Sequence, residues 1–137
     1  MNLFQDGDFT SHAGLPLKWK LECDAINDNE WRCIAKMVMD YQDRPFYKAV
    51  GIPRGGLKFA EAMNEYASGN DTDQIMICDD VFTTGTSMLD FIKEEYPLWS
   101  MGQGYRWVVF ARNSSNVHPF HTKALFTMPG PLWNDND

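Results

Sequence analysis

The feature that most constrains the fold of this chain is a strand–loop–helix pattern that occurs twice in succession in the middle of the sequence. In each copy a short apolar run, typical of a buried strand, ends at turn residues and precedes a segment with apolar residues at helical spacing. The paired segments are Lys48–Ile52 with Leu57–Ala67, and Gln74–Cys78 with Ser87–Tyr96. Two successive units of this kind predict neighbouring parallel strands that are joined by helical crossovers.

Further elements flank these two units. A helix is predicted over residues 27–42, because Asn27 and Glu30 form a capping box and apolar residues follow at helical spacing. The apolar segments Arg106–Ala111 and Ala124–Thr127 supply further strands. The predicted fold class is therefore α/β, with a small doubly wound parallel sheet flanked by helices. In such sheets ligands bind beyond the carboxyl ends of the strands.

Composition narrows the class of protein. With 137 residues and 44% hydrophobic content, residues 1–137 are expected to fold as a single domain. Twelve basic against 19 acidic residues give a net charge of −7, which disfavours nucleic acid as a partner. Three cysteines without a CxxC pair, no leader-like start and no long apolar run predict a cytoplasmic protein that does not enter a membrane.

The loop of the second unit carries the strongest functional signal. Asp79 and Asp80 follow the strand directly, and hydroxyl residues surround a glycine where the next helix begins: Thr83, Thr84, Gly85, Thr86 and Ser87. Unpaired amides at a helix N-terminus bind phosphate, and the hydroxyls add donors. The two carboxylates can accept hydrogen bonds from a vicinal diol or face a metal ion. Helix capping alone does not explain this unbroken order, which predicts a site for a ribose 5-phosphate group.

The loop of the first unit has a complementary character. Pro53, Arg54, Gly55 and Gly56 follow the strand, so the glycines can expose amides to a diphosphate while the Arg54 guanidinium adds a fixed positive charge. The alternative is an ordinary turn with a surface arginine. The position of this loop one unit before the hydroxyl-rich loop favours a functional role.

Together these two loops resemble the signatures of the type I phosphoribosyltransferases. The stretch from Ile75 to Ser87 resembles their phosphoribosyl-pyrophosphate motif, and Val50 to Leu57 is similar to the pyrophosphate loop of bacterial xanthine-guanine enzymes. The resemblance implies that the threonine–glycine loop holds the 5-phosphate and that Asp79 and Asp80 address the ribose hydroxyls and Mg²⁺. It also implies a catalytic role for both acids and for Arg54.

The same resemblance implies an unusual backbone feature and an assembly. Pyrophosphate loops of this type often hold a non-proline cis peptide, so we expect a cis bond between Pro53 and Arg54. A homodimer is common on this fold. Phosphoribosyl pyrophosphate and a nucleobase or nucleotide are the implied partners, in a role such as nucleotide salvage.

The two ends of the chain point to different bases. The segment from Phe9 to Gly14 is similar to the opening of orotate phosphoribosyltransferases, with His12 where those enzymes usually place a lysine. There an aromatic-bearing strand, here the one with Trp19, lies over the base. The C-terminus resembles the tail of xanthine-guanine enzymes, in which a tryptophan, here Trp133, stacks on a purine. A surface histidine and a tryptophan docked on the sheet are the alternatives, and the base remains open.

One part of the family pattern is missing. Only 25 positions separate Arg54 from Asp79, which leaves no room for the mobile hairpin that usually closes over the reacting ribose. Two functions therefore stand side by side: a Mg²⁺-dependent transferase, and a non-catalytic module that senses phosphoribosyl pyrophosphate or a nucleotide. His118 and His121 lack the partners of a metal site and are interpreted as loop residues.

Overall fold

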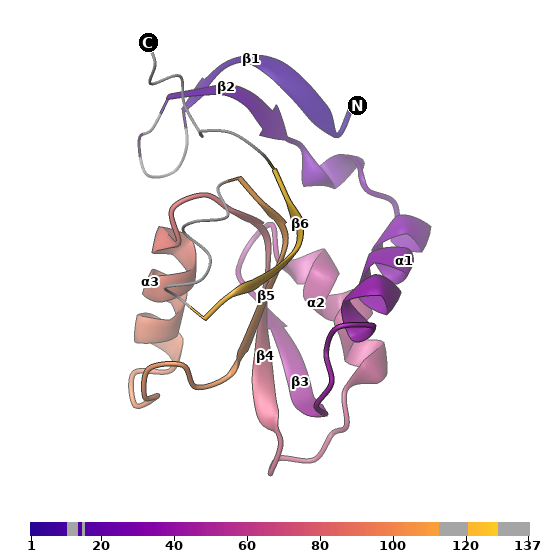
Figure 1. The fold of residues 1–137 in the computed structure, drawn as a ribbon, viewed down its shortest axis with the longest axis vertical. Helices are drawn as coiled ribbons and strands as arrows, with labels where there is room; N and C mark the ends of the chain where they lie inside the picture. The colour runs from indigo at the N-terminus through magenta and orange to yellow at the C-terminus, as the bar shows by residue number, and fades with distance from the viewer. Residues whose placement is uncertain (11–13, 15, 113–120, 129–137) are drawn as a thin grey trace.

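The computed structural model describes residues 1–10, 14, 16–112 and 121–128, and these form two sheets and a set of helices (Figure 1). An antiparallel hairpin, β1 (Phe4–Thr10) with β2 (Pro16–Leu21), precedes a four-stranded parallel sheet in the order β3-β4-β5-β6. Its strands are β3 (Phe46–Gly51), β4 (Gln74–Phe82), β5 (Tyr105–Ala111) and β6 (Lys123–Thr127). The helices are α1 (Asp28–Met39), α2 (Leu57–Met63) and α3 (Thr86–Glu95), with 3₁₀ turns η1 (Cys23–Ala25) and η2 (Asn64–Tyr66). The predicted α/β class, with a parallel sheet flanked by helices, is confirmed.

The parallel sheet is covered on both faces, as expected for strands that read as continuous apolar runs. On one face α1 and α2 pack against the sheet, with Trp31, Phe59 and Trp107 in a common core. On the other face α3 buries Met88 and Ile92 against the sheet. Figure 1 shows α3 on the side of the sheet opposite to α1 and α2.

The placement of α2 and α3 opens a crevice between β3 and β4. The strand order runs in one direction, yet the connection after β3 turns to one face and the connection after β4 turns to the other. Neighbouring loops that diverge in this way leave a gap at the carboxyl edge, which is where open α/β sheets bind ligands. The β3–α2–β4 and β4–α3–β5 crossovers step in the same direction along the sheet but lie on opposite faces. They must therefore have opposite handedness, and one of them departs from the usual right-handed rule.

Local bounds differ from the prediction at two places. β4 continues through Asp79 to Phe82, a stretch predicted as loop, because these residues pair with β5 as far as Phe82 with Ala111. The helix expected to reach Ala67 ends at Met63 and continues as η2. The side chain of Asn64 then accepts a hydrogen bond from the Ala49 amide at 2.8 Å and donates one to the Ala49 carbonyl at 2.9 Å. Asn64 thus occupies the outer edge of β3.

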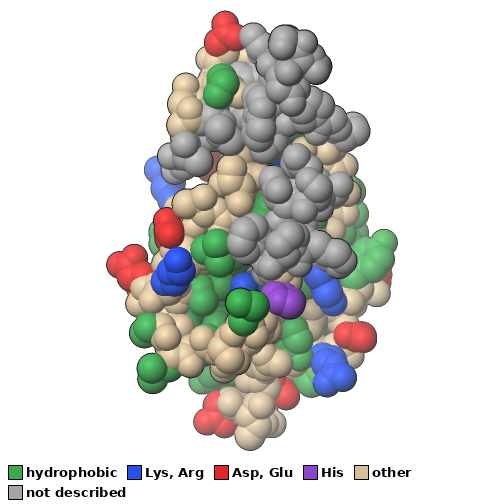
Figure 2. All heavy atoms as spheres, turned by 60° about the vertical axis from the view of Figure 1, so that its left-hand side comes forward, with side chains coloured by type: hydrophobic (Ala, Val, Ile, Leu, Met, Phe, Trp, Pro, Cys, Tyr) green, Lys and Arg blue, Asp and Glu red, His purple; other side chains and the backbone are tan. Residues whose placement is uncertain are grey.

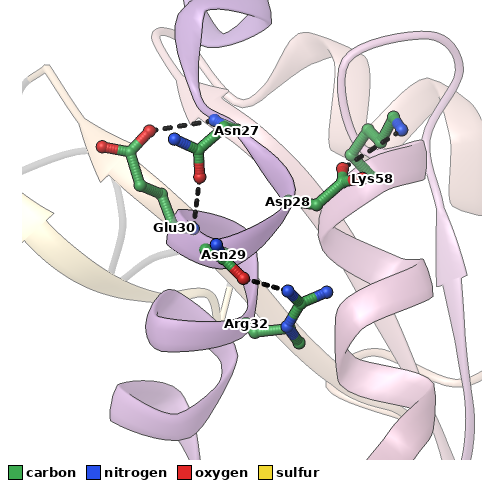
Figure 3. A network of polar contacts seen from close by, with 6 residues as sticks. All are labelled: Asn27, Asp28, Asn29, Glu30, Arg32 and Lys58. Atoms are coloured by element: carbon green, nitrogen blue, oxygen red, sulfur yellow. Dashed lines mark hydrogen bonds and ion pairs between the residues drawn. The ribbon is translucent and has the colours of Figure 1, made fainter.

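The predicted capping box of α1 is confirmed (Figure 3). The Glu30 amide donates to Asn27 Oδ1 at 2.8 Å, and the Asn27 amide donates to Glu30 Oε1 at 2.9 Å. The same figure shows Lys58 of α2 reaching Asp28 of α1, at 3.5 Å, which ties the two helices on this face.

The surface on one side of the molecule carries charges of both signs. On the α3 side of the molecule, Figure 2 shows lysine and arginine side chains scattered among acidic and apolar ones rather than gathered into one basic surface. None of the helices in the described part of the chain is long and apolar enough to span a bilayer.

Candidate functional site

A cavity of about 670 Å³ lies at the carboxyl edge of the sheet. Figure 1 shows the β1–β2 hairpin beyond this edge. Its walls come from segments far apart in the sequence. They are Phe9 and Thr10 of β1, residues 20–24 at the end of β2, residues 52–55 after β3, residues 79–88 around the end of β4, and Arg112 after β5. Both predicted loops therefore open into one space.

The hydroxyl-rich loop connects β4 to α3 and lines the cavity over Thr83 to Ser87. Gly85 is the residue before the helix and has φ 87°, a left-handed conformation that glycine adopts without steric cost. The turn leaves the first amides of α3 at the cavity. The Thr84 and Thr86 hydroxyls lie 2.9 Å apart, and the Thr86 amide donates to Thr84 Oγ1 at 3.4 Å. Amides, hydroxyls and the helix dipole thus converge where a phosphate can bind.

The acidic pair lies within β4 and lines the same cavity. Asp79 is 8% exposed, and its Oδ1 accepts the Asp80 amide at 2.9 Å, while Asp80 Oδ1 accepts the Val81 amide at 2.8 Å. Burial raises the pKa of Asp79 to about 8, and the neighbouring charge of Asp80 adds to the effect. Near neutral pH the Asp79 carboxyl therefore holds a proton, which a bound metal ion would displace.

The predicted cis peptide between Pro53 and Arg54 is confirmed. The loop approaches β4 so closely that a Cβ at Gly55 would overlap the Asp80 carboxylate. Arg54 is exposed, with Nη2 at 3.7 Å from Asp24 Oδ2 of η1. The Gly56 amide donates to the Ile52 carbonyl at 2.8 Å, and Gly56 is not among the residues that line the cavity, so its contact with a diphosphate stays a prediction. A Cβ at Gly56 would meet the Cys78 carbonyl, so this glycine serves close packing.

Arg112 is a site residue that the sequence analysis missed. It is 2% exposed and lines the cavity just after β5. Its guanidinium lies 3.7 Å from the centre of the Trp19 ring, and Nη2 donates to the Trp19 carbonyl at 2.5 Å. Nη1 is buried and has no hydrogen-bond partner among the described residues. The signal was available, since a basic residue after a predicted strand lies at the carboxyl edge.

The hairpin contributes a second basic group. Lys20 lines the cavity, with Nζ 5.0 Å above the Phe9 ring and 3.5 Å from Glu22 Oε2. Trp19, which the family resemblance placed over the base, does not line the cavity. Two other predicted contacts, His12 and Trp133, lie outside the described residues, as does His118.

The residues suit a magnesium ion that is shared with a ligand. No group of three histidine, cysteine, aspartate or glutamate side chains in the described ranges could hold a metal alone. Asp79 and Asp80 supply hard carboxylate oxygens, and Mg²⁺ usually takes only one or two of these together with water and phosphate oxygens. The donor set therefore fits Mg²⁺ that binds together with a diphosphate.

Solved structures share this architecture. An orotate phosphoribosyltransferase from Aeropyrum pernix superposes with a TM-score of 0.71 at 16% identity, over 91% of this chain and 88% of the other. The chain has the fold of the type I phosphoribosyltransferases. APRTase from Giardia lamblia in complex with 9-deazaadenine gives a TM-score of 0.64 at 16% identity, over 90% of this chain and 94% of the other.

Although the fold is shared, the sequence of this chain differs widely from those of the similar structures. UMP synthase from Leishmania donovani gives a TM-score of 0.71 at 15% identity, and the match covers 91% of this chain but 33% of that one. The sequence itself matches no protein-family model and no curated protein.

Proposed function

We propose that this chain is a Mg²⁺-dependent phosphoribosyltransferase that moves ribose 5-phosphate from phosphoribosyl pyrophosphate to an orotate-like pyrimidine and releases diphosphate. The observation that carries the proposal is the convergence of three groups on one cavity: the Thr83–Ser87 loop, the Asp79–Asp80 pair and Arg54. Each matches a different part of the donor. No nucleophilic side chain is needed, because the leaving diphosphate itself opens the ribose carbon to attack.

The proposed roles follow from position. The amides and hydroxyls of the Thr83–Ser87 loop bind the 5-phosphate, which fixes the ribose at the end of α3. Asp79 and Asp80 accept hydrogen bonds from the ribose hydroxyls. Arg54 stabilises negative charge on the diphosphate as the bond between C1 and oxygen breaks and the base nitrogen bonds to C1. Asp79 and Asp80 would hold the Mg²⁺, which would supply positive charge against the diphosphate.

Arg112 favours a base that carries a carboxylate. The described residues offer its buried guanidinium no ion-pair partner, and an unpaired buried charge is costly. An orotate carboxylate would supply the missing acceptor at the hairpin end of the cavity. This choice agrees with the orotate phosphoribosyltransferases among the similar structures, whereas a purine base carries no carboxylate.

The test is a screen of orotate, uracil, adenine and guanine with phosphoribosyl pyrophosphate and Mg²⁺, following diphosphate release. We expect release that depends on orotate and stops when Mg²⁺ is chelated. Release with a purine alone would overturn the base assignment. No release with any base, together with no donor binding, would overturn the function. A homodimer, checked by light scattering, and a cytoplasmic location belong to the same proposal.

A non-catalytic sensor is the second candidate, and one observation favours it. Between Arg54 and Asp79 the structure holds only α2, η2, a turn and the first five residues of β4, so no hairpin from this segment can close over the ribose and exclude water. Tight binding of phosphoribosyl pyrophosphate or a nucleotide without turnover would support this function instead.

A further inference from the structure

The hairpin and the end of β5 meet through one cationic side chain. Arg112 follows β5 and is buried, yet it has no ion pair with another described residue. Its Nη2 is held by the Trp19 carbonyl, and its flat face lies 3.7 Å from the centre of the Trp19 ring. Nη1 is the group that remains for a ligand.

Trp19 is not among the residues that line the cavity, whereas Lys20, its neighbour on β2, is. The Trp19 ring stacks instead on the guanidinium of Arg112, and Arg112 does line the cavity. Trp19 can therefore influence recognition through Arg112.

Stacking and the carbonyl bond together restrict how Arg112 can turn. A guanidinium is planar, and an indole is the best aromatic partner for it, so the stack fixes the plane of the group. The Nη2 bond fixes its rotation within that plane. With both fixed, Nη1 keeps one direction, and a carboxylate in the cavity meets a donor that is already oriented.

We propose that Trp19 is a positioning residue that sets base specificity by holding Arg112, so that Nη1 recognises a carboxylate on the base. This inference rests on the proposed function and adds a residue that determines its specificity. It predicts that removing the indole weakens discrimination for the carboxylate without weakening recognition of the sugar phosphate.

The experiment compares two nucleotides that differ by one carboxylate, orotidine 5′-phosphate and uridine 5′-phosphate, with ribose 5-phosphate as the reference. Binding is measured by calorimetry on the wild-type chain, Trp19→Leu, Trp19→Phe, and Phe4→Leu as control. Phe4 lies on the same hairpin, is 57% exposed and does not line the cavity. Circular dichroism checks that each variant is folded.

We expect the wild type and Phe4→Leu to prefer orotidine 5′-phosphate by about tenfold or more, the value of one charge-assisted hydrogen bond. Trp19→Leu should lose most of this preference and Trp19→Phe part of it, while ribose 5-phosphate affinity stays unchanged. If Trp19→Leu does not fold, Trp19→Tyr is added to the series. The preference for orotidine 5′-phosphate must then fall from the wild type to Trp19→Tyr and again to Trp19→Phe.

Two outcomes count against different claims. A wild-type preference that Trp19→Leu or the graded series retains would overturn the positioning role while leaving the proposed function intact. A wild type that binds neither nucleotide nor the phosphoribosyl donor would overturn the proposed function.

Discussion

The two ends of the cavity are built in different ways. The phosphate end is contiguous: the acidic pair and the hydroxyl-rich loop occupy nine consecutive positions, Asp79 to Ser87, on one strand–loop–helix unit. The base end is assembled from Phe9, Lys20 and Arg112, which only the fold brings together. A contiguous site has its geometry set by local hydrogen bonds, whereas a dispersed one depends on how the hairpin packs.

The largest effect is expected at the phosphate end. Replacing Asp79 and Asp80 together by asparagine removes both charged acceptors, so phosphoribosyl-pyrophosphate affinity should fall by at least about 100-fold while the fold is kept. Calorimetry measures it. The matched control is Asp40→Asn with Asp43→Asn, two exposed acids at the amino edge of the sheet. Equal affinity in both double variants would remove the acidic pair from the site.

A smaller effect is expected at Gly85, where loss of phosphate binding can be distinguished from the cost of backbone strain. Gly85→Ala places a side chain at φ 87° and should cost about 1 kcal/mol of unfolding free energy. Gly69→Ala should cost about the same, because Gly69 has φ 71° and open space around it. Only Gly85→Ala should also weaken ribose 5-phosphate binding, by about tenfold. If both variants lose affinity equally, the loop is not the phosphate site.

The raised pKa of Asp79 predicts a pH dependence confined to the phosphate end. Metal and diol need the ionised pair, so donor affinity should rise as pH increases toward and past about 8. The folded state holds this proton more tightly than the unfolded state, so the stability it adds is lost as pH rises through about 8. Asp79→Asn should abolish that loss of stability in thermal melts. A melting temperature with the same pH slope in both proteins would contradict the shift.

The smallest effect is expected at Arg54. Its exposed ion pair with Asp24 competes with a bound diphosphate, so Asp24→Asn should raise diphosphate affinity about two- to fivefold at low salt. The advantage should shrink at physiological ionic strength. The control is Asp28→Asn, which breaks the comparable surface pair with Lys58 away from the cavity. Weaker binding by Asp24→Asn would mean that Asp24 belongs to the diphosphate site.

The sequence predicted the contiguous phosphate end of the cavity better than the dispersed base end. Gly85 and the hydroxyl-rich loop were predicted, because each depends on neighbours within a few positions. The cis bond before Arg54 was predicted from the family resemblance of the loop around it. The extension of β4 through Asp79 to Phe82 was not, because pairing with β5 overrides the local turn signals. Arg112 could have been found as a basic residue after a predicted strand, but its contact with Trp19 joins positions 93 apart in the chain, which no local pattern indicates.

The segment that follows α2 hydrogen-bonds the outer edge of β3, and this bears on how small such a protein can be. Asn64 offers Ala49 the donor and the acceptor that a neighbouring strand would offer, and the Ser68 and Gly69 amides reach the carbonyls of Phe46 and Tyr47. A single turn of chain after α2 therefore does the work of an additional strand. The crevice arises between β3 and β4 alone. The sheet can therefore do without a further strand beyond β3, and no group that faces the ligand has to move.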